Sequence, residues 1–451
     1  MIHKLVRGVR PARSFAQFFA GVTALIALGE PIPAYADAAS PASAAFFPPV
    51  TSYGTGGSSA ESVAVADVDR DGEVDLIVAN CASTSSGCWL ATENGSVGVS
   101  LGNADGTFRA ATTYGSGGIG AHAVAVADVN RDGSADLLAV NFFSGTVGVL
   151  LGNGDGSFRP VVPYGSGGVN PQSISIADLN GDHQPDVVIA NVCNADPCSG
   201  GAVAVLLGKG DGTFQAPTQY VGFNAQAVTI ADVNHDHRAD LVVASGVFTV
   251  SVLRGRGDGT FSPAVSYGSG GFGSRAVSVA DVNEDGQPDI VVSNCSADAS
   301  RGCGGTSSDG VVGVLLGNGT GTFQAVRTFT SGGKDDTSLA VADMNGDAKL
   351  DLLVAHGCDA SGNCGAATVS VLKGRGDGSF EAPETQSAGP SGASATSLAV
   401  ADVNGDHEPD LLVAAGDTVG VLLHPDSPSR ACHHFTPHRA HHPGRSPAPG
   451  R

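Results

Sequence analysis

The sequence predicts an all-β fold, a seven-bladed β-propeller built from four-stranded antiparallel blades. Three observations lead to this prediction. A short acidic phrase occurs seven times at intervals of roughly 50 to 60 residues, and a glycine-rich phrase recurs between its copies. The last repeat also lacks a segment that is present before the first repeat. Regular internal repetition of this kind is the sequence signature of a repeat architecture.

The acidic phrase indicates the first two strands of each repeat. Its first copy reads VADVDRDGEVDLIVAN, at 65–80, and places the pattern D-x-[DN]-x-D-x-x-x-D between two apolar runs. In the second repeat, these runs predict strands at about 123–129 and 136–142. Short aliphatic runs that are bounded by turn residues are typical of strands.

The glycine-rich phrase indicates a hairpin between the third and fourth strands. Its copies read LGNADGTF or close variants, at 101–108, 151–158, 207–214, 254–261, 316–323 and 373–380. Gly-Asp-Gly suits a tight turn because such turns need positive φ angles. In the second repeat it separates strands predicted at about 146–152 and 158–164. No segment of useful length has helical periodicity, and four antiparallel strands repeated seven times are typical of a propeller.

The two ends of the repeat array are expected to meet in one blade. The last repeat ends TVGVLLHPDS, at 418–427, without a glycine-rich hairpin or a fourth strand. The segment FFPPVTSYGTGG, at 46–57, resembles the segment FRPVVPYGSGG, at 158–168, which contains a fourth strand. We therefore predict that an N-terminal strand completes the last blade and hides sheet edges that would otherwise promote aggregation.

The N-terminus is predicted to be a secretory signal peptide at 1–36. A basic start is followed by the apolar segment 15–29, which is too short to span a bilayer. Ala34-Tyr35-Ala36 has the A-x-A form of a cleavage site, so the mature, secreted chain would begin near Asp37. A buried N-terminal helix is the alternative.

The other boundaries follow from composition. Residues 37–44 are expected to form a linker, 45–425 the propeller, and 426–451 a disordered tail rich in His, Pro and Arg. Six of the 13 histidines lie at or after residue 424, together with the unpaired Cys432. Transition-metal binding by this tail and an incidental tail are the two alternatives.

The net charge excludes two classes of partner. A formal charge of −21 would repel nucleic acid and anionic membrane surfaces. After residue 40, no run of 18 apolar residues is present, so no membrane span is expected. The first acidic phrase holds four Asp and each of the other six holds three Asp and one Asn, which places 22 of the 44 acidic residues in these phrases. The acidity is therefore mostly local.

Eight of the nine cysteines form close pairs in Gly/Ser-rich insertions that follow the second strand of four repeats. The pairs are Cys81/Cys88, Cys193/Cys198, Cys295/Cys303 and Cys358/Cys364. We predict disulfides, which are typical of exported proteins. Zinc sites are the alternative, although the spacings are irregular and the pairs lie in different repeats.

The polar positions of the acidic phrase are predicted to bind a metal ion. Carboxylates this close together repel one another unless a hard cation lies among them. Positions one, three, five and nine can direct oxygens inward, and the main-chain carbonyl of position seven can add another. Flexible all-oxygen coordination favours Ca²⁺ over Mg²⁺. Position twelve is Val78, Ala139 or Ile189 in the first three copies, where an EF-hand needs Glu, so an EF-hand is excluded.

The sequence thus predicts up to seven structural Ca²⁺ ions. The predicted ligands are Asp67, Asp69, Asp71, Asp75, Asp128, Asn130, Asp132, Asp136, Asp178, Asn180, Asp182, Asp186, Asp232, Asn234, Asp236, Asp240, Asp281, Asn283, Asp285, Asp289, Asp343, Asn345, Asp347, Asp351, Asp402, Asn404, Asp406 and Asp410. Position six favours Gly for a left-handed turn, and three loops have it. The four loops with His183, His237, Ala348 or His407 at this position are expected to be strained or weaker.

The acidic loop within VADVNxDG, followed by GxGDGTF, resembles the FG-GAP/VCBS repeat of the seven-bladed propeller in integrin α subunits and in many secreted bacterial proteins. The resemblance covers about 380 residues. It implies structural calcium in the loops and a propeller that serves as a binding or adhesion platform. It transfers only loop ligands such as Asp128, Asn130, Asp132 and Asp136, because the partners of this family differ widely.

Three other features are interpreted as structural. Two Arg-Gly-Asp tripeptides, at 256–258 and 375–377, lie in the hairpin phrase, where Asn153 and Lys209 replace the arginine in other copies. They are therefore predicted to be turns rather than adhesion motifs. Asp335 and Asp336 are expected to be exposed loop residues. No H-E-x-x-H motif is present.

We therefore predict a secreted, non-catalytic, monomeric module that binds an extracellular protein or glycan partner. One alternative is a lectin-like propeller with sugars between its blades, which the single Trp and few Tyr do not favour. The other is a lyase or hydrolase with a site in the central channel. His, Arg and carboxylate side chains gathered at one channel mouth would favour the enzyme.

Overall fold

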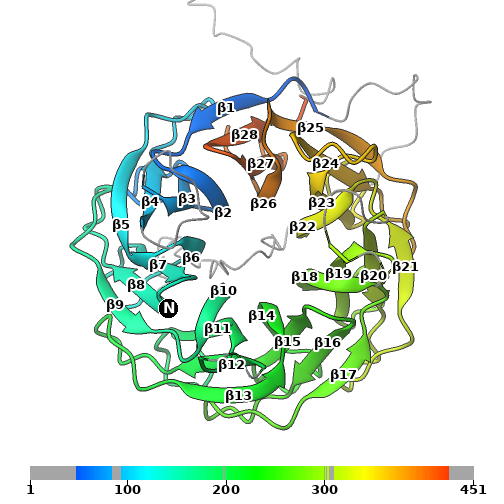
Figure 1. The fold of residues 1–451 in the computed structure, drawn as a ribbon, viewed down its shortest axis with the longest axis horizontal. Helices are drawn as coiled ribbons and strands as arrows, with labels where there is room; N and C mark the ends of the chain where they lie inside the picture. Colours follow the sequence, from blue (N-terminus) through cyan, green and yellow to red (C-terminus); the bar gives the residue numbers. More distant parts are fainter. Residues whose placement is uncertain are drawn as a thin grey trace, which may run out of the picture.

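The computed structural model describes residues 47–83, 93–196, 198, 200–298, 300, 302–303 and 309–425. It is a ring of seven four-stranded antiparallel sheets around a central axis (Figure 1). The predicted fold class is confirmed, and no α-helix occurs among the described residues. In the same part of the chain, no helix is long and apolar enough to cross a membrane.

Blades are numbered by the chain order of their innermost strands, and each contains four strands. Blade 1 contains β2 (Ser58–Ala66), β3 (Asp75–Ala82), β4 (Asn94–Ser100) and β5 (Thr112–Ile119); blade 2 contains β6 (Ala121–Ala127), β7 (Asp136–Asn141), β8 (Thr146–Leu150) and β9 (Val162–Gly165); blade 3 contains β10 (Val169–Ala177), β11 (Asp186–Cys193), β12 (Gly201–Leu206) and β13 (Thr218–Phe223); blade 4 contains β14 (Ala225–Ala231), β15 (Asp240–Ser245), β16 (Thr249–Leu253) and β17 (Val265–Gly268).

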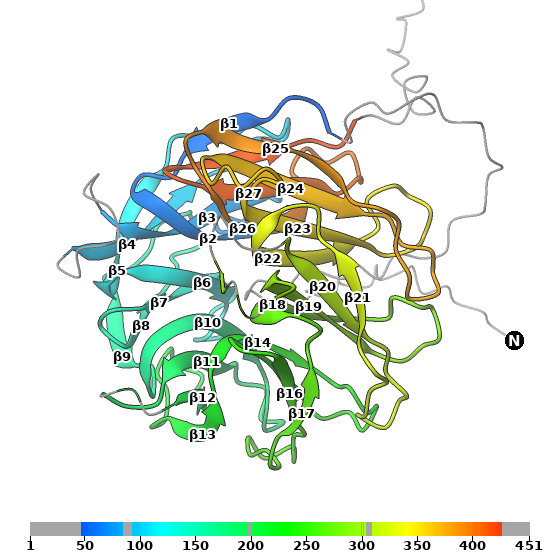
Figure 2. The same ribbon diagram turned by 45° about the vertical axis from the view of Figure 1, so that its right-hand side comes forward.

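The remaining blades follow the same order, except for the last strand of blade 7. Blade 5 contains β18 (Phe272–Ala280), β19 (Asp289–Ser296), β20 (Val311–Leu315) and β21 (Arg327–Thr330); blade 6 contains β22 (Lys334–Ala342), β23 (Asp351–Cys358), β24 (Ala366–Leu372) and β25 (Glu384–Ser391); blade 7 contains β26 (Ala395–Ala401), β27 (Asp410–Ala415), β28 (Thr418–Leu422) and β1 (Thr51–Gly54). Figure 2 shows the blades stacked face to face around the ring.

Strand boundaries in the second repeat differ from the prediction at the inner and fourth strands, and the third strand ends at Leu150 rather than at residue 152. The inner strand β6 begins and ends two residues earlier than expected, and the fourth strand begins at Val162 rather than at residue 158. Phe158 forms only an isolated bridge with Gly152, which closes the glycine-rich hairpin. The chain then runs for three residues outside the sheet before β9 begins, because the tight turn and the outer strand are separate elements.

The predicted closure by an N-terminal strand is confirmed. β1 pairs antiparallel with β28, from Thr51 opposite Val421 to Gly54 opposite Thr418. The main chain continues this contact, since Thr55 N donates to Asp417 O at 3.1 Å. The blade that closes the ring therefore joins two ends of the chain that are more than 360 residues apart.

The hydrophobic core consists of seven layers, one between each pair of successive blades. Second strands such as β7 and β27 are buried along their whole length because both faces of each sheet pack against a neighbour. One layer, for example, joins Ile77 and Val97 of blade 1 to Val124 and Leu137 of blade 2. Stability thus depends on contact between blades as well as on pairing within them.

An aromatic pair joins six of the seven seams at the outer edge. In each, a Tyr or Phe on the fourth strand of one blade packs edge-on against the Phe that ends the hairpin phrase of the next blade. The pairs are Tyr53/Phe108, Tyr114/Phe158, Tyr164/Phe214, Tyr220/Phe261, Tyr267/Phe323 and Phe329/Phe380, with ring centroids 5.3–5.7 Å apart. At the seventh seam Phe47, which precedes β1, takes the hairpin position, and its N–H donates to Gln386 Oε1 at 3.1 Å.

Candidate metal centres

Of the 28 predicted metal ligands, 21 lie in the seven turns that join the inner strand of each blade to its second strand, and the seven ninth-position aspartates are the first residues of the second strands. Because the blades are equivalent around a closed ring, these acidic loops share one face, called here the loop face. The insertions between second and third strands lie on the opposite face, called the insertion face.

The ninth position of each loop is a buried clasp. Asp75 accepts a hydrogen bond from Val68 N in its own loop at 2.7 Å and another from Gly102 N in the glycine-rich hairpin at 2.8 Å. The same two contacts recur in every blade at 2.7–3.1 Å, through Asp136, Asp186, Asp240, Asp289, Asp351 and Asp410. In blades 1 to 6 each of these carboxylates ties the acidic loop to the following hairpin, and in blade 7, which has no such hairpin, Asp410 ties the loop to His424 N after β28.

Burial raises the pKa of all seven ninth-position aspartates to about 6. The two main-chain N–H groups oppose this shift in each case, while the charges of neighbouring loop aspartates add to it. At neutral pH each loop therefore holds a desolvated carboxylate beside other carboxylates, which is costly without a counter-charge.

The remaining loop positions converge on one another. In the first loop, carboxylate oxygens of Asp67, Asp69 and Asp71 lie within 4.8 Å of one another. The first aspartate of every loop also accepts the main-chain N–H of position six, at 2.7–3.0 Å. A carboxylate has about four lone-pair sites, so these contacts leave acceptor capacity. The donor set is all oxygen and fits a hard cation such as Ca²⁺.

Position six is left-handed in all seven loops, as the sequence pattern predicts. The non-glycine residues comply with φ of 63° at His183, 62° at His237, 67° at Ala348 and 70° at His407. Such conformations cost a non-glycine residue roughly 1–2 kcal/mol.

Position four is left-handed as well, which the sequence reasoning missed. Three loops without Gly at position six have Gly181, Gly346 or Gly405 at position four. The fourth loop has neither, since His235 and His237 occupy both positions with φ of 59° and 62°. It therefore carries the most backbone strain of the seven.

The two kinds of loop aspartate are expected to respond differently to substitution. Asp289→Ala leaves the buried Val282 N and Gly317 N without partners, and unsatisfied buried donors cost about 1–3 kcal/mol each. We expect a loss of roughly 3 kcal/mol or more in urea unfolding with EDTA present. The matched variant Asp285→Ala removes an exposed loop carboxylate and should cost less than about 1 kcal/mol under these conditions. Equal losses of unfolding free energy in the two variants would contradict the structural role assigned to the ninth-position aspartate.

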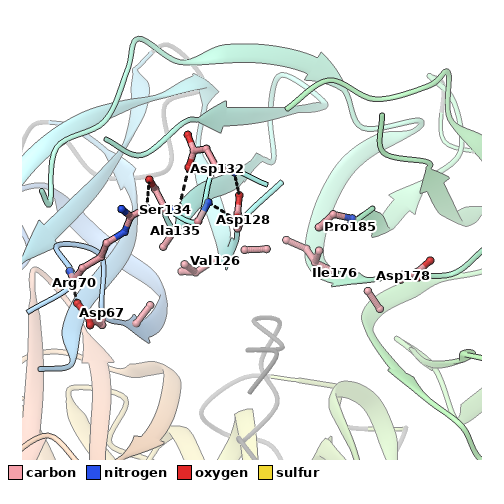
Figure 3. Close-up of a pocket in the computed structure, with 14 residues that line it drawn as sticks. Asp67, Arg70, Val126, Asp128, Asp132, Ser134, Ala135, Ile176, Asp178 and Pro185 are labelled. Carbon is pink, nitrogen blue, oxygen red and sulfur yellow. Dashed lines mark hydrogen bonds between the residues drawn. The ribbon is translucent and has the colours of Figure 1, made fainter. Parts of the chain in front are cut away.

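A cavity of about 700 Å³ opens on the loop face where blades 1, 2 and 3 meet (Figure 3). Ala66, Ala127 and Ala177 form part of its wall at the ends of their inner strands. Its rim includes the first aspartates of three loops, Asp67, Asp128 and Asp178. Arg70 spans the first two loops, since its guanidinium donates to Ser134 Oγ at 2.5 Å. The cavity is thus continuous with the candidate metal loops.

Both Arg-Gly-Asp tripeptides lie in hairpin turns. Asp258 Oδ1 accepts Thr260 N at 2.9 Å, and the Arg256 guanidinium donates to Phe261 O at 2.7 Å. Asp377 makes the equivalent contact with Ser379 N at 2.9 Å. Each aspartate stabilises its own turn, as the hairpin interpretation requires.

A polar ring that the sequence reasoning missed surrounds the propeller axis. Every inner strand contains a β-bulge, and the residue omitted from pairing at the bulge is polar in all seven blades. These residues form the axial ring: Glu61, His122, Gln172, Gln226, Arg275, Thr337 and Thr396. Bulges commonly redirect a side chain next to a functional site. Each ring residue lies six positions before the first loop aspartate, which is the signal that would have found it.

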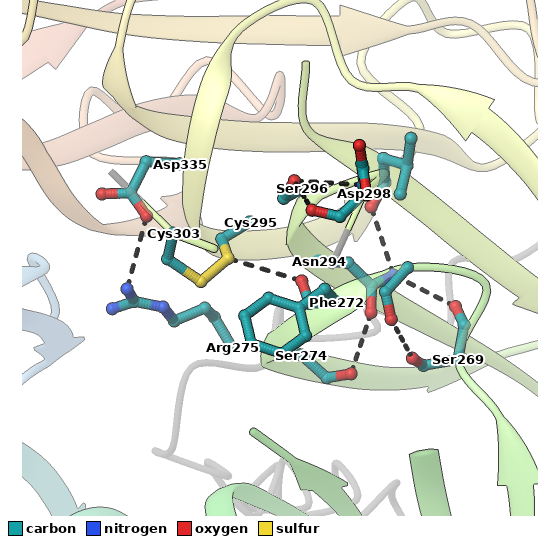
Figure 4. Close-up of a disulfide and its surroundings, with 12 residues drawn as sticks. Ser269, Phe272, Ser274, Arg275, Asn294, Cys295, Ser296, Asp298, Cys303 and Asp335 are labelled. Carbon is teal, nitrogen blue, oxygen red and sulfur yellow. Dashed lines mark hydrogen bonds and ion pairs between the residues drawn. A yellow bond between two sulfur atoms is a disulfide. The ribbon is translucent and has the colours of Figure 1, made fainter. Parts of the chain in front are cut away.

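Some ring residues tie neighbouring blades together. Thr337 Oγ1 donates to Ala395 O at 2.9 Å, and Thr396 Oγ1 donates to Ala60 O at 2.6 Å. Arg275 forms an ion pair with Asp335 of blade 6 at 3.3 Å, next to the Cys295–Cys303 disulfide (Figure 4). This part of the ring therefore contributes to the scaffold.

Histidine, arginine and carboxylate side chains do gather in the axial ring, as the enzyme alternative requires. Burial raises the pKa of Glu61 to about 7 and lowers that of His122 to about 4. However, Arg275 is paired with Asp335, and one nitrogen of His122 contacts Gln172 O at 3.2 Å. The ring therefore contains the residue types expected of a catalytic site, but no cationic group among them is free.

The expectation that Asp335 and Asp336 are exposed loop residues is wrong. Both lie in β22, and Asp336 is fully buried, where it accepts from Ser331 Oγ at 2.8 Å and contacts His356 Nδ1 at 2.8 Å. His356 Nε2 lies 2.8 Å from Ser370 Oγ. This order resembles a hydrolase triad, but all three side chains are 0% exposed. Ser116 of blade 1 and Asn141 of blade 2 form a hydrogen bond at the equivalent place, so the network is a structural contact between neighbouring blades.

Three of the four predicted disulfides are confirmed. They join Cys193 to Cys198, Cys295 to Cys303 and Cys358 to Cys364, and each links the end of a second strand to the insertion that follows it. Cys88 lies outside the described residues, as do the predicted signal peptide at 1–36, the linker at 37–44, the tail at 426–451 and Cys432.

Comparison with known proteins identifies the repeat. A family model described as FG-GAP-like repeat matches residues 88–139, 135–189, 244–292, 303–354 and 360–413, more than half of the chain. Comparison with curated proteins gives no match.

Solved structures share the fold. BBS1N in complex with ARL6DN, in a crystal soaked with lead, matches with a TM-score of 0.53 at 12% identity, over 84% of this chain and 98% of that one. A protein from Lactobacillus plantarum matches with a TM-score of 0.50 at 15% identity, over 74% of this chain and 86% of that one. At these identities the likeness concerns the fold alone.

Proposed function

The chain belongs to the FG-GAP-like repeat family, and from this membership we propose that it is a secreted, calcium-stabilised propeller that acts as a non-catalytic binding module for an extracellular protein. The observation that carries this proposal is the difference between its two faces. The loop face repeats one set of contacts seven times, whereas the insertion face carries segments that differ from blade to blade. Variable loops on a rigid scaffold are the usual place for binding residues.

Calcium follows from the geometry of the loops. Three carboxylates converge in the first loop, and every loop adds a buried aspartate whose pKa is raised to about 6. A bound Ca²⁺ would offset the repulsion among these groups, and no residue of the loops supplies an equivalent positive charge in each blade. In this proposal the ions are structural, and up to seven would bind.

Export is supported by the disulfides. Cross-linked insertions such as those closed by Cys193–Cys198 and Cys358–Cys364 persist in oxidising compartments. Protein binding is supported by the family and by BBS1N, a propeller of similar fold whose structure was solved in complex with another protein, ARL6DN. The insertions are the proposed contact surface, since the second and third strands that they join end at one face of the ring.

The proposal is tested by partner capture with a matched loop variant. Immobilised mature protein would be cross-linked to proteins of the secreted fraction, in Ca²⁺ and in EDTA. In the variant, residues 357–367 are replaced by Gly-Asp, the short turn that blade 7 uses between β27 and β28, so that the pairing of His356 with Thr368 is kept. We expect a partner that is retained in Ca²⁺ and lost from an insertion variant that still melts normally. Partner capture that is unchanged by shortening any of the insertions would contradict the assignment of the contact surface to the insertions.

A further inference from the structure

Comparison of the seven blades separates positions that hold the same residue in every blade from positions whose residue changes from blade to blade. The clasp aspartate is identical in all seven blades, and the outer Phe recurs in all seven. The axial ring is polar in every blade, but it contains an acid, a base, an imidazole, two amides and two hydroxyls. A position that keeps its geometry and polarity while its chemistry changes is suited to contact with an asymmetric ligand.

The ring groups on blades 1, 3 and 4 make no hydrogen bond to another blade. Within the described residues, the side chains of Glu61 and Gln172 have no hydrogen-bond or ion-pair partner, and Gln226 contacts only Asn224 Oδ1, at 3.3 Å. All three are partly exposed. They contrast with Thr337 and Thr396, which are bonded to neighbouring blades, so unused polar groups gather on one side of the ring.

His122, between these groups on blade 2, presents a defined tautomer. Its Nδ1 lies 3.2 Å from Gln172 O, a carbonyl that can only accept, so Nδ1 carries the proton. Nε2 is then left as an acceptor, because burial keeps the ring neutral by lowering its pKa to about 4. Blades 1 to 4 therefore offer two amides, one imidazole acceptor and one carboxyl group.

Exposed aromatic rings lie beside the same sector. The short turn after β7 exposes Phe143, which packs edge-on against Phe142, and Phe142 stacks on His122 with centroids 5.6 Å apart. The short turn after β15 exposes Phe248, 44% accessible, against Phe272 of blade 5. These two exposed phenyl rings flank blade 3 and offer apolar faces on which a ligand can pack.

We propose that the axial ring of blades 1 to 4, flanked by Phe143 and Phe248, is a binding site for a neutral carbohydrate. Sugar hydroxyls both donate and accept hydrogen bonds, as amides and a neutral imidazole also do. The apolar faces of a pyranose ring suit exposed phenyl rings. This sector has one ionisable acid and no free cation, which favours a neutral ligand over an acidic one. The site comprises ring residues and the short second-to-third-strand turns of blades 2 and 4, and it uses neither the calcium loops nor the long insertions of other blades, so it goes beyond the function proposed above.

The test is a glycan array of neutral and uronate-containing oligosaccharides, probed with the mature protein in Ca²⁺ buffer. The neutral oligosaccharide with the strongest signal is then titrated by calorimetry against Gln172→Ala, Gln226→Ala and Phe248→Ala. Gln215→Ala is the matched control, since Gln215 is exposed next to the hairpin of blade 3, away from the ring. We expect each ring variant to lose at least tenfold in affinity and the control to match wild type.

Absence of array binding, preference for uronates, or equal affinity of ring and control variants would overturn this proposal. Thermal melts of the variants within about 2 °C of wild type show that the fold is retained. The melt in EDTA tests calcium separately, so failure of one proposal leaves the other standing. Cleavage of the bound oligosaccharide, detected by mass spectrometry and lost in the ring variants, would support the site and overturn the non-catalytic assignment.

Discussion

Chelation with EDTA is expected to lower the melting temperature of the propeller by more than about 10 °C, and added Ca²⁺ should restore it. A ligand that binds only the folded state stabilises it by about 2.7 kcal/mol per site at a hundred times its Kd. Seven equivalent loops would multiply this effect. The reason lies in each loop, where a buried clasp aspartate with a pKa raised to about 6 adjoins other carboxylates. Differential scanning calorimetry gives the measurement.

Controls separate structural calcium from a general effect of salt. Mg²⁺ at the same concentration should restore less of the melting temperature, because it requires a tighter octahedral geometry. Asp71→Ala, which removes one of the three converging carboxylates of the first loop, should lower the calcium stoichiometry by one. A melt that is the same in EDTA and in Ca²⁺ would end the structural-calcium proposal.

The parts of the fold that could be predicted are those that recur in the sequence. Each acidic phrase marks one blade because it joins two strands that have to be neighbours in one sheet. The displaced strand was recognisable because Tyr53 and Gly54 occur in the same setting as Tyr164 and Gly165. The fourth strands were placed too early because Phe158 belongs to the hairpin and to an aromatic seam rather than to the strand.

Features that depend on three-dimensional pairing were not predictable in the same way. A bulge is defined by the register of two strands, and its residues differ from blade to blade, so the axial ring forms no repeated word in the sequence. The second left-handed position was also hidden, because Arg70 and Glu284 occupy it in two loops and Gly181 in another, so no single residue type marks it. Asp336 appeared exposed because it lies in the charged run Lys334-Asp335-Asp336, whereas His356 provides a buried partner from β23.

The candidate metal loops were predictable from the sequence only in part. Their oxygen-rich pattern predicts a cation, and the structure brings Asp67, Asp69 and Asp71 together as that pattern requires. The pattern does not reveal that the ninth aspartate also holds two main-chain N–H groups. One of them, Gly102 N in the first blade, is 27 residues away and is brought near only by the fold. One residue type thus has two roles that composition alone cannot separate.

Deleting residues 47–54 from the mature protein is expected to abolish a stable monomeric fold. The deletion removes β1 and leaves the apolar edge strand β28, TVGVL, without its partner. It also takes Phe47 and Tyr53 out of the two core layers on either side of blade 7. Unpaired apolar edges promote association, so size-exclusion chromatography should show aggregates in place of the monomer.

Point variants test whether side chains at the closure, rather than strand pairing alone, hold the ring together. Phe47→Ala should destabilise by about 3–5 kcal/mol, as is usual for a buried Phe. Thr51→Ala, at an exposed position of the same strand, is the matched control and should stay within about 0.5 kcal/mol of wild type. Phe47 packs in the core layer between blades 6 and 7. Loss of its side chain should loosen this contact, so Phe47→Ala should also increase proteolysis of blades 6 and 7 before the other blades. A truncated chain that remains monomeric and melts near the wild-type temperature would show that the ring closes without its N-terminal strand.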